Sequence, residues 1–221
     1  MKLEITIPTK LNEIKLHQYQ KFLSIAKDNE DEEFLQQKMI QIFCGVDLKN
    51  VLNFKYKDIV EITTTLSTMF NNNHSFVQRF KMNGVEFGFI PNLEDISFGE
   101  YTDLDTYITD WDNMHKAMAV LYRPITDKFR NTYSITDYNG TNEYAEIMKN
   151  IPLDICLGSI VFFYNLGNEL LKATIHYLEN NQEVQSILHQ QTLDKNGDGT
   201  IQSMLSLKET LESLTQSPSY L

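Results

Sequence analysis

Three side chains in the stretch LDKNGDGTIQSML have the spacing of the first half of an EF-hand calcium loop. Asp194, Asn196 and Asp198 stand at loop positions 1, 3 and 5, and Gly199 stands at position 6, where the loop turns sharply. Position 12, which normally supplies a bidentate carboxylate, is Leu205. Without that acid we expect weak calcium binding or none. The alternative interpretation is a connection between two helices, in which the Asn-Gly and Asp-Gly pairs tolerate positive φ.

The rest of the chain offers no pattern with the spacing of a catalytic or cofactor site. There is no G-x-S-x-G motif and no glycine-rich phosphate loop. Cys44 and Cys156 stand among apolar residues without a neighbouring histidine or base, which is typical of unreactive thiols. No two histidines have metal-binding spacing on one helix. We therefore expect a protein that is not an enzyme and that binds no cofactor, and no metal beyond the weak calcium candidate.

The charge balance argues against adhesion to nucleic acid. The net charge is -11 with an isoelectric point near 4.9, and no run of Lys and Arg could neutralise phosphates.

Hydrophobic residues make up 42% of the chain, which is enough for a sizeable core. The apolar stretch IPLDICLGSIVFFYNLG is interrupted by Asp154 and falls short of the roughly 18 residues of a membrane span. We expect a core helix there, and the start of the chain lacks the apolar core of a signal peptide.

Helical periodicity dominates the pattern of apolar residues. This periodicity is clear in EIKLHQYQKFLSIAK, DEEFLQQKMIQIFCG and YKDIVEITTTLSTMF. The acid-rich run from Asp28 to Glu33 is more typical of a solvated helix start than of a metal site. The alternation of Leu3, Ile5 and Ile7 predicts a short strand that ends at Pro8. Further helices are predicted over residues 153–180, 182–191 and 200–215. The predicted fold is mainly α: a helical domain with a small β-hairpin, α+β at the margin, and a long interface loop.

The clearest local signal predicts a β-hairpin over residues 76–90. Two β-rich runs in SFVQRFKMNGVEFGFIPNL flank Asn83-Gly84, the dipeptide preferred in a type I′ turn. An isolated hairpin is marginally stable in water, so its aromatic residues must lie on helices or on a partner chain. Phe76, Phe87 and Phe89 are therefore candidates for an interface.

The next segment, DISFGEYTDLDTYITDWDNMHKAMAVLYRPI, predicts a helix with an acidic outer face. Ser97 and Glu100 have the spacing of a capping box at its start. Residues two apart on a helix do not face each other, so its acids are interpreted as a solvated face rather than as catalytic pairs. The acids concerned are Asp103, Asp105, Asp110 and Asp112.

Residues 122–142 break the helical pattern and are predicted to form a long loop. Tyr and Arg are over-represented at interface hot spots, so this loop is either a docking patch or a loop packed on its own domain. Its candidate interface residues are Tyr122, Arg123, Phe129, Arg130, Tyr133 and Tyr138. The predicted organisation is an N-terminal helical region, 1–150, and a C-terminal helical region, 151–221, joined in one compact unit.

Three stretches together carry a resemblance to a known family: LEITIPTKLNEIKLHQYQKFL, FKMNGVEFGFIPNLEDISFGEYTDLDTYI and MAVLYRPI. With them the chain resembles structural proteins of tailed phages that infect Bacteroidota. It is most similar to the portal-associated ring, or head-to-tail connector, proteins of the crAss-like phages. The similarity covers roughly residues 1–170, and none of its motifs is catalytic. The chain is also similar to proteins of related phages that are labelled tail assembly chaperones.

The resemblance implies a virion protein that is made in the bacterial cytoplasm and placed in the head-to-tail region. Its partners would be about twelve copies of itself in a ring, the portal protein, and other ring or tail proteins, with no membrane involved. DNA would pass nearby without specific binding, along a channel lined by Asp103, Asp105, Asp110 or Asp112. A closed ring needs a heterologous contact, and the predicted one joins the hairpin to the 122–142 loop. The alternatives are an assembly chaperone absent from the mature virion and a calcium-binding helical module.

Overall fold

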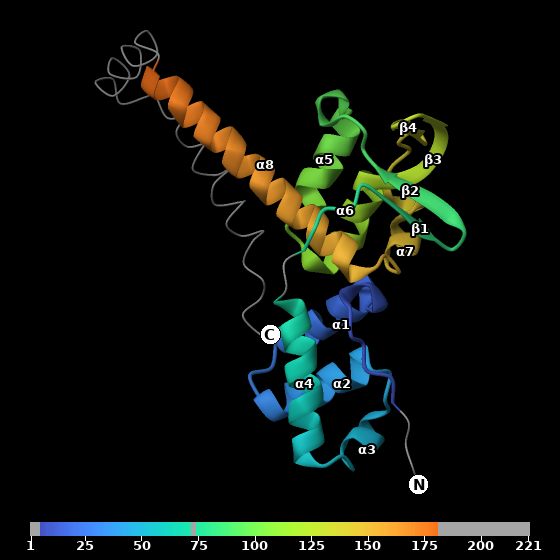
Figure 1. Cartoon of the computed structure of the whole chain (residues 1–221), viewed down its shortest axis with the longest axis vertical. Helices are drawn as coiled ribbons and strands as arrows, with labels where there is room; N and C mark the ends of the chain where they lie inside the picture. The colour runs from blue at the N-terminus through green and yellow to red at the C-terminus, as the bar shows by residue number, and fades with distance from the viewer. Residues whose placement is uncertain (1–4, 72–73, 181–221) are drawn as a thin grey trace. The chain divides into compact units, whose positions relative to one another are not determined.

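A computed structural model of the chain describes residues 5–71 and 74–180 (Figure 1). The described part is mainly helical with one small antiparallel sheet, which confirms the predicted fold class. The chain divides into two compact units, the first ending at Gly158 and the second beginning at Ser159, and each is described by itself. Among the described residues no helix is long and apolar enough to cross a membrane.

The N-terminal part of the first unit is a group of helices around an aromatic core. Phe43 lies 5.5 Å from Phe22 and 5.3 Å from Phe70 between ring centroids, and Tyr19 lies 5.5 Å from Phe70. These side chains come from the apolar faces that the helical periodicity predicted, and that prediction is confirmed. The helices are α1 (Leu16–Ala26), α2 (Glu32–Phe43), α3 (Leu48–Val51) and α4 (Tyr56–Phe70), preceded by a 3₁₀ turn at Leu11–Glu13.

The prediction of a short strand at the N-terminus is wrong for the residues of it that the structure describes, Ile5 to Pro8. They are in neither strand nor helix, and Leu3 lies outside the described residues. Ile5 and Ile7 instead line a groove of about 890 Å³ together with Phe54 and Ile62. The alternating apolar side chains are therefore half-buried against helices, and no strand lies beside them in the described chain to make them part of a sheet.

The sheet is a four-stranded antiparallel meander in the order β1-β2-β3-β4. The predicted hairpin is confirmed as β1–β2: Asn83 and Gly84 both have positive φ, 52° and 79°, as a type I′ turn requires. Rings of Phe80, Phe87, Phe89 and Tyr122 contact one another on the inner face. The strands are β1 (Arg79–Met82), β2 (Val85–Phe89), β3 (Tyr122–Phe129) and β4 (Thr132–Ile135).

The long loop predicted over residues 122–142 is wrong for its first two thirds, which form the β3–β4 hairpin. The turn between these strands uses Arg130 at a φ of 56°. Pro124 and the Ser, Thr and Asn content suggested a loop. Pro124 lies in β3 opposite Phe87, and its carbonyl still accepts a hydrogen bond from the backbone N–H of Thr136, so the strand continues through the proline.

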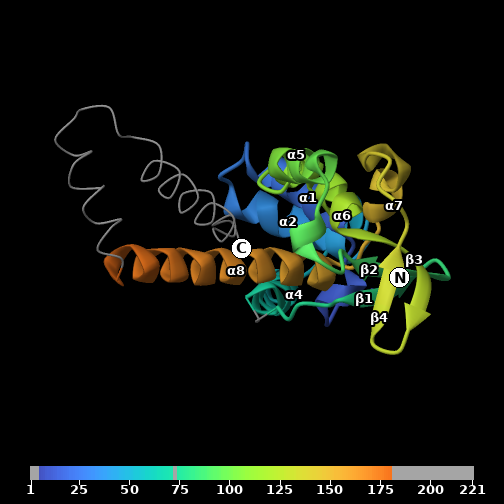
Figure 2. The same cartoon turned by 90° about the horizontal axis from the view of Figure 1, so that it is seen from above.

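Helices connect β2 to β3 and follow β4. α6 (Met114–Leu121) is almost completely buried and lies between α5 (Phe98–Tyr107) and the sheet in both views (Figure 2). α8 (Leu153–Asn180) coincides with the helix predicted over residues 153–180, whereas those predicted over 182–191 and 200–215 lie outside the described residues. The short elements are 3₁₀ turns at Leu93–Asp95, Trp111–Asn113 and Thr141–Glu143, and α7 (Ala145–Met148).

Candidate functional site

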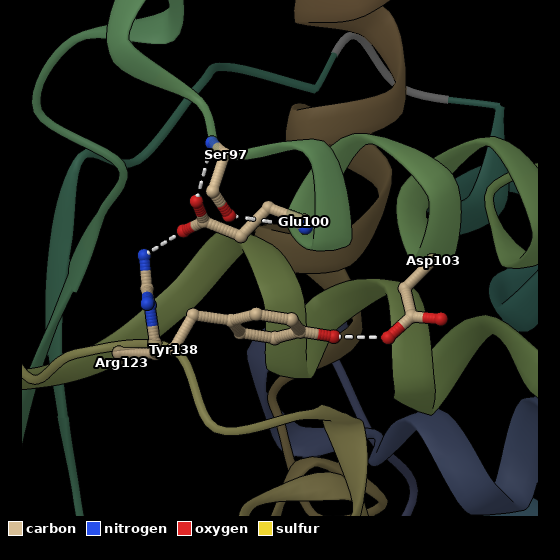
Figure 3. Close-up of polar contacts among 5 residues, drawn as sticks. All are labelled: Ser97, Glu100, Asp103, Arg123 and Tyr138. Carbon is tan, nitrogen blue, oxygen red and sulfur yellow. Dashed lines mark hydrogen bonds and ion pairs between the residues drawn. The ribbon is translucent and has the colours of Figure 1, made fainter.

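A buried ion pair joins the start of α5 to β3. Glu100 and Arg123 are only 6% and 5% exposed, and an oxygen of the Glu100 carboxylate is paired with the Arg123 guanidinium (Figure 3). The predicted capping box places Glu100: its backbone N–H donates to the Ser97 hydroxyl, and its carboxylate accepts from the Ser97 N–H at 2.8 Å. One side chain therefore both caps α5 and attaches it to the sheet.

Opposing effects act on the pKa of Glu100, and the net result is a charged carboxylate. Burial raises this pKa, but the hydrogen bonds from Ser97 and the positive charge of Arg123 outweigh burial, so the pKa falls below its ordinary value of 4.5. Removing either partner would leave the other charge desolvated. The pair thus behaves as a locked structural contact at neutral pH.

Tyr138 closes the other side of this cluster. Its ring lies 5.4 Å from the guanidinium carbon of Arg123, and its hydroxyl donates a hydrogen bond to Asp103 of α5 (Figure 3). Burial, followed by the carboxylate of Asp103, raises the pKa of Tyr138 well above the ordinary range, so the hydroxyl stays protonated and keeps donating. Gly99 of α5 faces this ring, since a Cβ built there would lie 3.8 Å from it. We call Ser97, Glu100, Asp103, Arg123 and Tyr138 the α5 clamp.

A cavity of about 430 Å³ lies beside the α5 clamp. Its walls carry three carboxylates, those of Asp95, Glu100 and Asp137, and a single guanidinium, that of Arg123. The Nε atom of Arg123 is buried and has no hydrogen-bond partner. Within the lining, Glu100 contacts both Ser97 and Arg123, so these residues hold α5 against the sheet.

The clamped helix presents large aromatic side chains to solvent. Phe98 is 85% exposed and Tyr101 is 58% exposed, both on the side of α5 away from Glu100 and Asp103. At the turn after β3, Phe129 is 71% exposed. Exposed apolar residues that are held on rigid elements are typical of protein contact surfaces.

The hairpin-to-loop contact predicted between neighbouring copies is wrong, because these segments pair within one chain. Phe87 and Phe89 of β2 lie in register with Pro124 and Tyr122 of β3, and Phe87, Phe89, Tyr122 and Tyr133 are 7% exposed or less. The predicted hairpin and the first two thirds of the predicted loop are neighbouring parts of one sheet, and Phe87, Phe89 and Tyr122 pack on its inner face. A β-rich aromatic run has the same composition whether it meets its own chain or another one.

The other candidate interface residues fall into two groups. Arg123, Tyr138 and Phe76 are buried or half-buried, and Phe76 packs against Phe89 with 4.8 Å between ring centroids. Phe129 and Arg130 are exposed and remain available for a partner.

The sequence analysis did not identify Phe98 and Tyr101 of α5 as candidate residues of a protein contact surface. Phe98 and Tyr101 flank the recognised capping residue Glu100, but the exposed face of a helix can be assigned only once its buried face is known. Glu100 itself was recognised as a cap, whereas its ion pair with Arg123 joins positions 23 residues apart.

The expectation of four outward acids is half correct. Asp105 and Asp112 are exposed, whereas Asp103 and Asp110 are half-buried. Asp103 accepts from Tyr138, and Asp110 accepts from the backbone N–H of Asp112 and from the side chain of Asn113. Two of the four acids therefore have structural roles.

The calcium candidates Asp194, Asn196 and Asp198 lie outside the described residues. Within residues 5–71 and 74–180, no group of three or more His, Cys, Asp or Glu side chains is placed to hold a metal ion.

Comparisons of the chain with protein-family models, with curated proteins and with solved structures gave no match.

Proposed function

We propose that the chain is a virion structural protein that forms a ring at the portal vertex, or head-to-tail connector, of a tailed phage. In this role it links the portal protein to the tail and surrounds the path of the DNA. Its partners are further copies of itself and the proteins above and below in the stack. The proposal joins the resemblance of the N-terminal and central stretches to the surface described above.

The observation that carries the proposal is the rigid display of aromatic side chains on α5. Phe98 and Tyr101 are exposed on a helix that is fixed to the sheet by the buried pair of Glu100 and Arg123. A contact residue held on a fixed element loses little conformational entropy when a partner binds, which favours a permanent contact. This arrangement suits an assembly component.

The acidic balance of the chain fits a position beside DNA. A net charge of -11 disfavours adhesion to a polyanion, so DNA can move past without being held. Asp105 and Asp112 are the exposed members of the predicted acidic set, and they are the residues that we place toward the channel.

Quantitative mass spectrometry of purified virions tests this function directly. The amount of this chain is measured against the amount of portal protein in the same particles, with infected-cell lysate as the comparison. We expect a ratio near one copy per portal subunit. Abundance in the lysate combined with absence from the particle would overturn the ring proposal and identify an assembly chaperone instead.

A second measurement tests the contact residues. Phe98→Ser and Tyr101→Ser remove exposed apolar area without touching the α5 clamp, so the monomer should melt within a few degrees of wild type. The same variants should be poorly incorporated into virions. The matched control is Val60→Ser, a 37% exposed residue of α4, which should be incorporated as wild type.

A further inference from the structure

The outer face of the sheet carries an excess of positive charge in an otherwise acidic chain. Arg79 and Lys81 of β1 and Lys128 of β3 are all exposed. They surround one carboxylate, that of Glu86 on β2: Lys81 is its cross-strand neighbour and Lys128 forms an ion pair with it. We call Arg79, Lys81 and Lys128 the basic face.

The geometry of the strands keeps these cations together. Arg79 lies over the ring of Tyr133, with 5.8 Å from the guanidinium carbon to the ring centroid, which places it on the same face as Tyr133 and its register partner Lys128. Asp127 alternates with Lys128 along β3 and therefore belongs to the opposite face. The hydrogen bond from Lys128, followed by the positive charges of Lys128, Lys81 and Arg79, lowers the pKa of Glu86, but one carboxylate cannot neutralise three cations.

The same unit carries an unmatched negative segment before and at the start of α2. Asp28, Glu30, Asp31, Glu32 and Glu33 are all exposed. None of the ion pairs between described residues includes any of them. α2 and β1 are well separated in both views, so the acidic run and the basic face of one molecule do not neutralise each other (Figures 1 and 2).

We propose that the basic face binds the acidic run, residues 28–33, of a neighbouring copy of this chain. The two surfaces differ, so the contact is heterologous and can repeat from copy to copy around a closed ring. This inference rests on the proposed ring and names the surfaces that would form it. It replaces the hairpin-to-loop contact, which is internal to the chain.

Charge complementarity favours this occupant over nucleic acid. A duplex would bring many phosphates close to a chain of net charge -11, while only three cations could compensate them. The acidic run is short and is surrounded by the same solvent as the basic face. Its five carboxylates are closer in number to the three cations than the phosphates of a duplex, and salt screens the remaining charges of the two copies beyond a Debye length of about 8 Å.

Paired charge reversals test the contact with the full-length chain. Variant A carries Arg79→Glu and Lys81→Glu, which makes the face acidic. Variant B carries Asp28→Lys, Glu30→Lys and Glu33→Lys, which makes the run basic and leaves the helix cap Asp31 in place. The association state of each is measured by sedimentation velocity at low salt and at about 1 M NaCl, where the Debye length is about 3 Å.

The expected result is a loss of association in each variant alone and a recovery when A and B are mixed. Alone, each variant opposes like charges, and we expect association to weaken roughly ten-fold or more. In the mixture the acidic face of A meets the basic run of B, and the basic face of B meets the acidic run of A. Wild-type association should also weaken at high salt.

A matched control separates this contact from a general effect of charge. Lys55→Glu with Lys57→Glu makes the same change in net charge at exposed positions of the α4 start, and it should associate as wild type does. Circular dichroism establishes that each variant is folded, and the milder pair Arg79→Gln with Lys81→Gln replaces variant A if that variant unfolds.

Three outcomes would overturn the inference. Association of wild type that neither variant weakens would refute this contact while leaving the ring proposal standing. DNA binding that variant A abolishes, with self-association unchanged, would assign the basic face to nucleic acid. A wild-type chain that stays monomeric at low salt would refute self-association in solution, and the virion measurement would then decide the ring proposal separately.

Discussion

Replacing Glu100 by Leu should destabilise the first unit more than most single substitutions do. Arg123 is 5% exposed, and in this variant its guanidinium would lose the carboxylate with which it is paired while its Nε atom already lacks a partner. Removing one member of a buried ion pair typically costs about 3–5 kcal/mol, because the remaining charge stays desolvated. That is a large part of the roughly 5–15 kcal/mol by which a native protein is stabilised.

The two members of the pair should not be equivalent. In Arg123→Met, the carboxylate of Glu100 keeps its hydrogen bond from the Ser97 N–H at 2.8 Å, so this variant should lose less stability than Glu100→Leu. In the double variant no unpaired charge is left in the core. We therefore expect the double variant to be more stable than Glu100→Leu alone.

Urea denaturation followed by the fluorescence of Trp111 provides the assay. Trp111 is the only tryptophan of the chain, and its half-buried ring lies 5.1 Å from the buried ring of Tyr19 between centroids, so it reports on the first unit. The expected loss for Glu100→Leu corresponds to a fall in Tm of roughly 6–20 °C. A loss below about 1 kcal/mol, or a double variant that shows the sum of the single losses, would refute the reasoning.

The pH dependence provides an independent check of the same pair. The pKa of Glu100 is lowered in the fold, so its contribution to stability is present above pH 4.5 and is lost as the pH falls below that value through the folded-state pKa. Glu100→Gln removes this titration. The free energy of unfolding of the variant should therefore fall less between neutral pH and the acid side of pH 4.5 than that of wild type.

The remaining predictions concern the sheet and one buried histidine. Phe87→Asp, at a residue 2% exposed, should unfold the first unit rather than release folded monomers, as circular dichroism would show. Gly88→Ala would place a Cβ against the Tyr133 ring, and urea denaturation should show a loss of stability of about 1–3 kcal/mol. Gly84→Ala, with a φ of 79° in open space, should lose only about 1 kcal/mol, through backbone strain alone. A loss at Gly88 no larger than the loss at Gly84 would contradict the packing argument. Burial, followed by nearby lysine charges, lowers the pKa of His115 below 6.5, so stability should decline as the pH falls through the folded-state pKa, and His115→Gln should show less of this decline.

Local elements of this protein could be predicted because short-range physics specifies them. The helix over Tyr56–Phe70 follows from its apolar spacing, and the turn at Asn83-Gly84 follows from residues that tolerate positive φ. The cap of Ser97 and Glu100 likewise depends on residues three apart. Each of these signals lies within one element, so one sequence was enough to find it.

The partners of those elements were decided only by the tertiary structure. The aromatic runs around Phe87 and Tyr122 were recognisable as segments that must be buried. Their composition did not determine whether they pair with each other within one chain or with another chain. The ion pair of Glu100 and Arg123 and the basic face around Glu86 join residues on different strands and helices. The chain alone determines which residues favour a helix, strand or turn, whereas burial and charge pairing depend on which distant segments share the same space, and only the fold decides that.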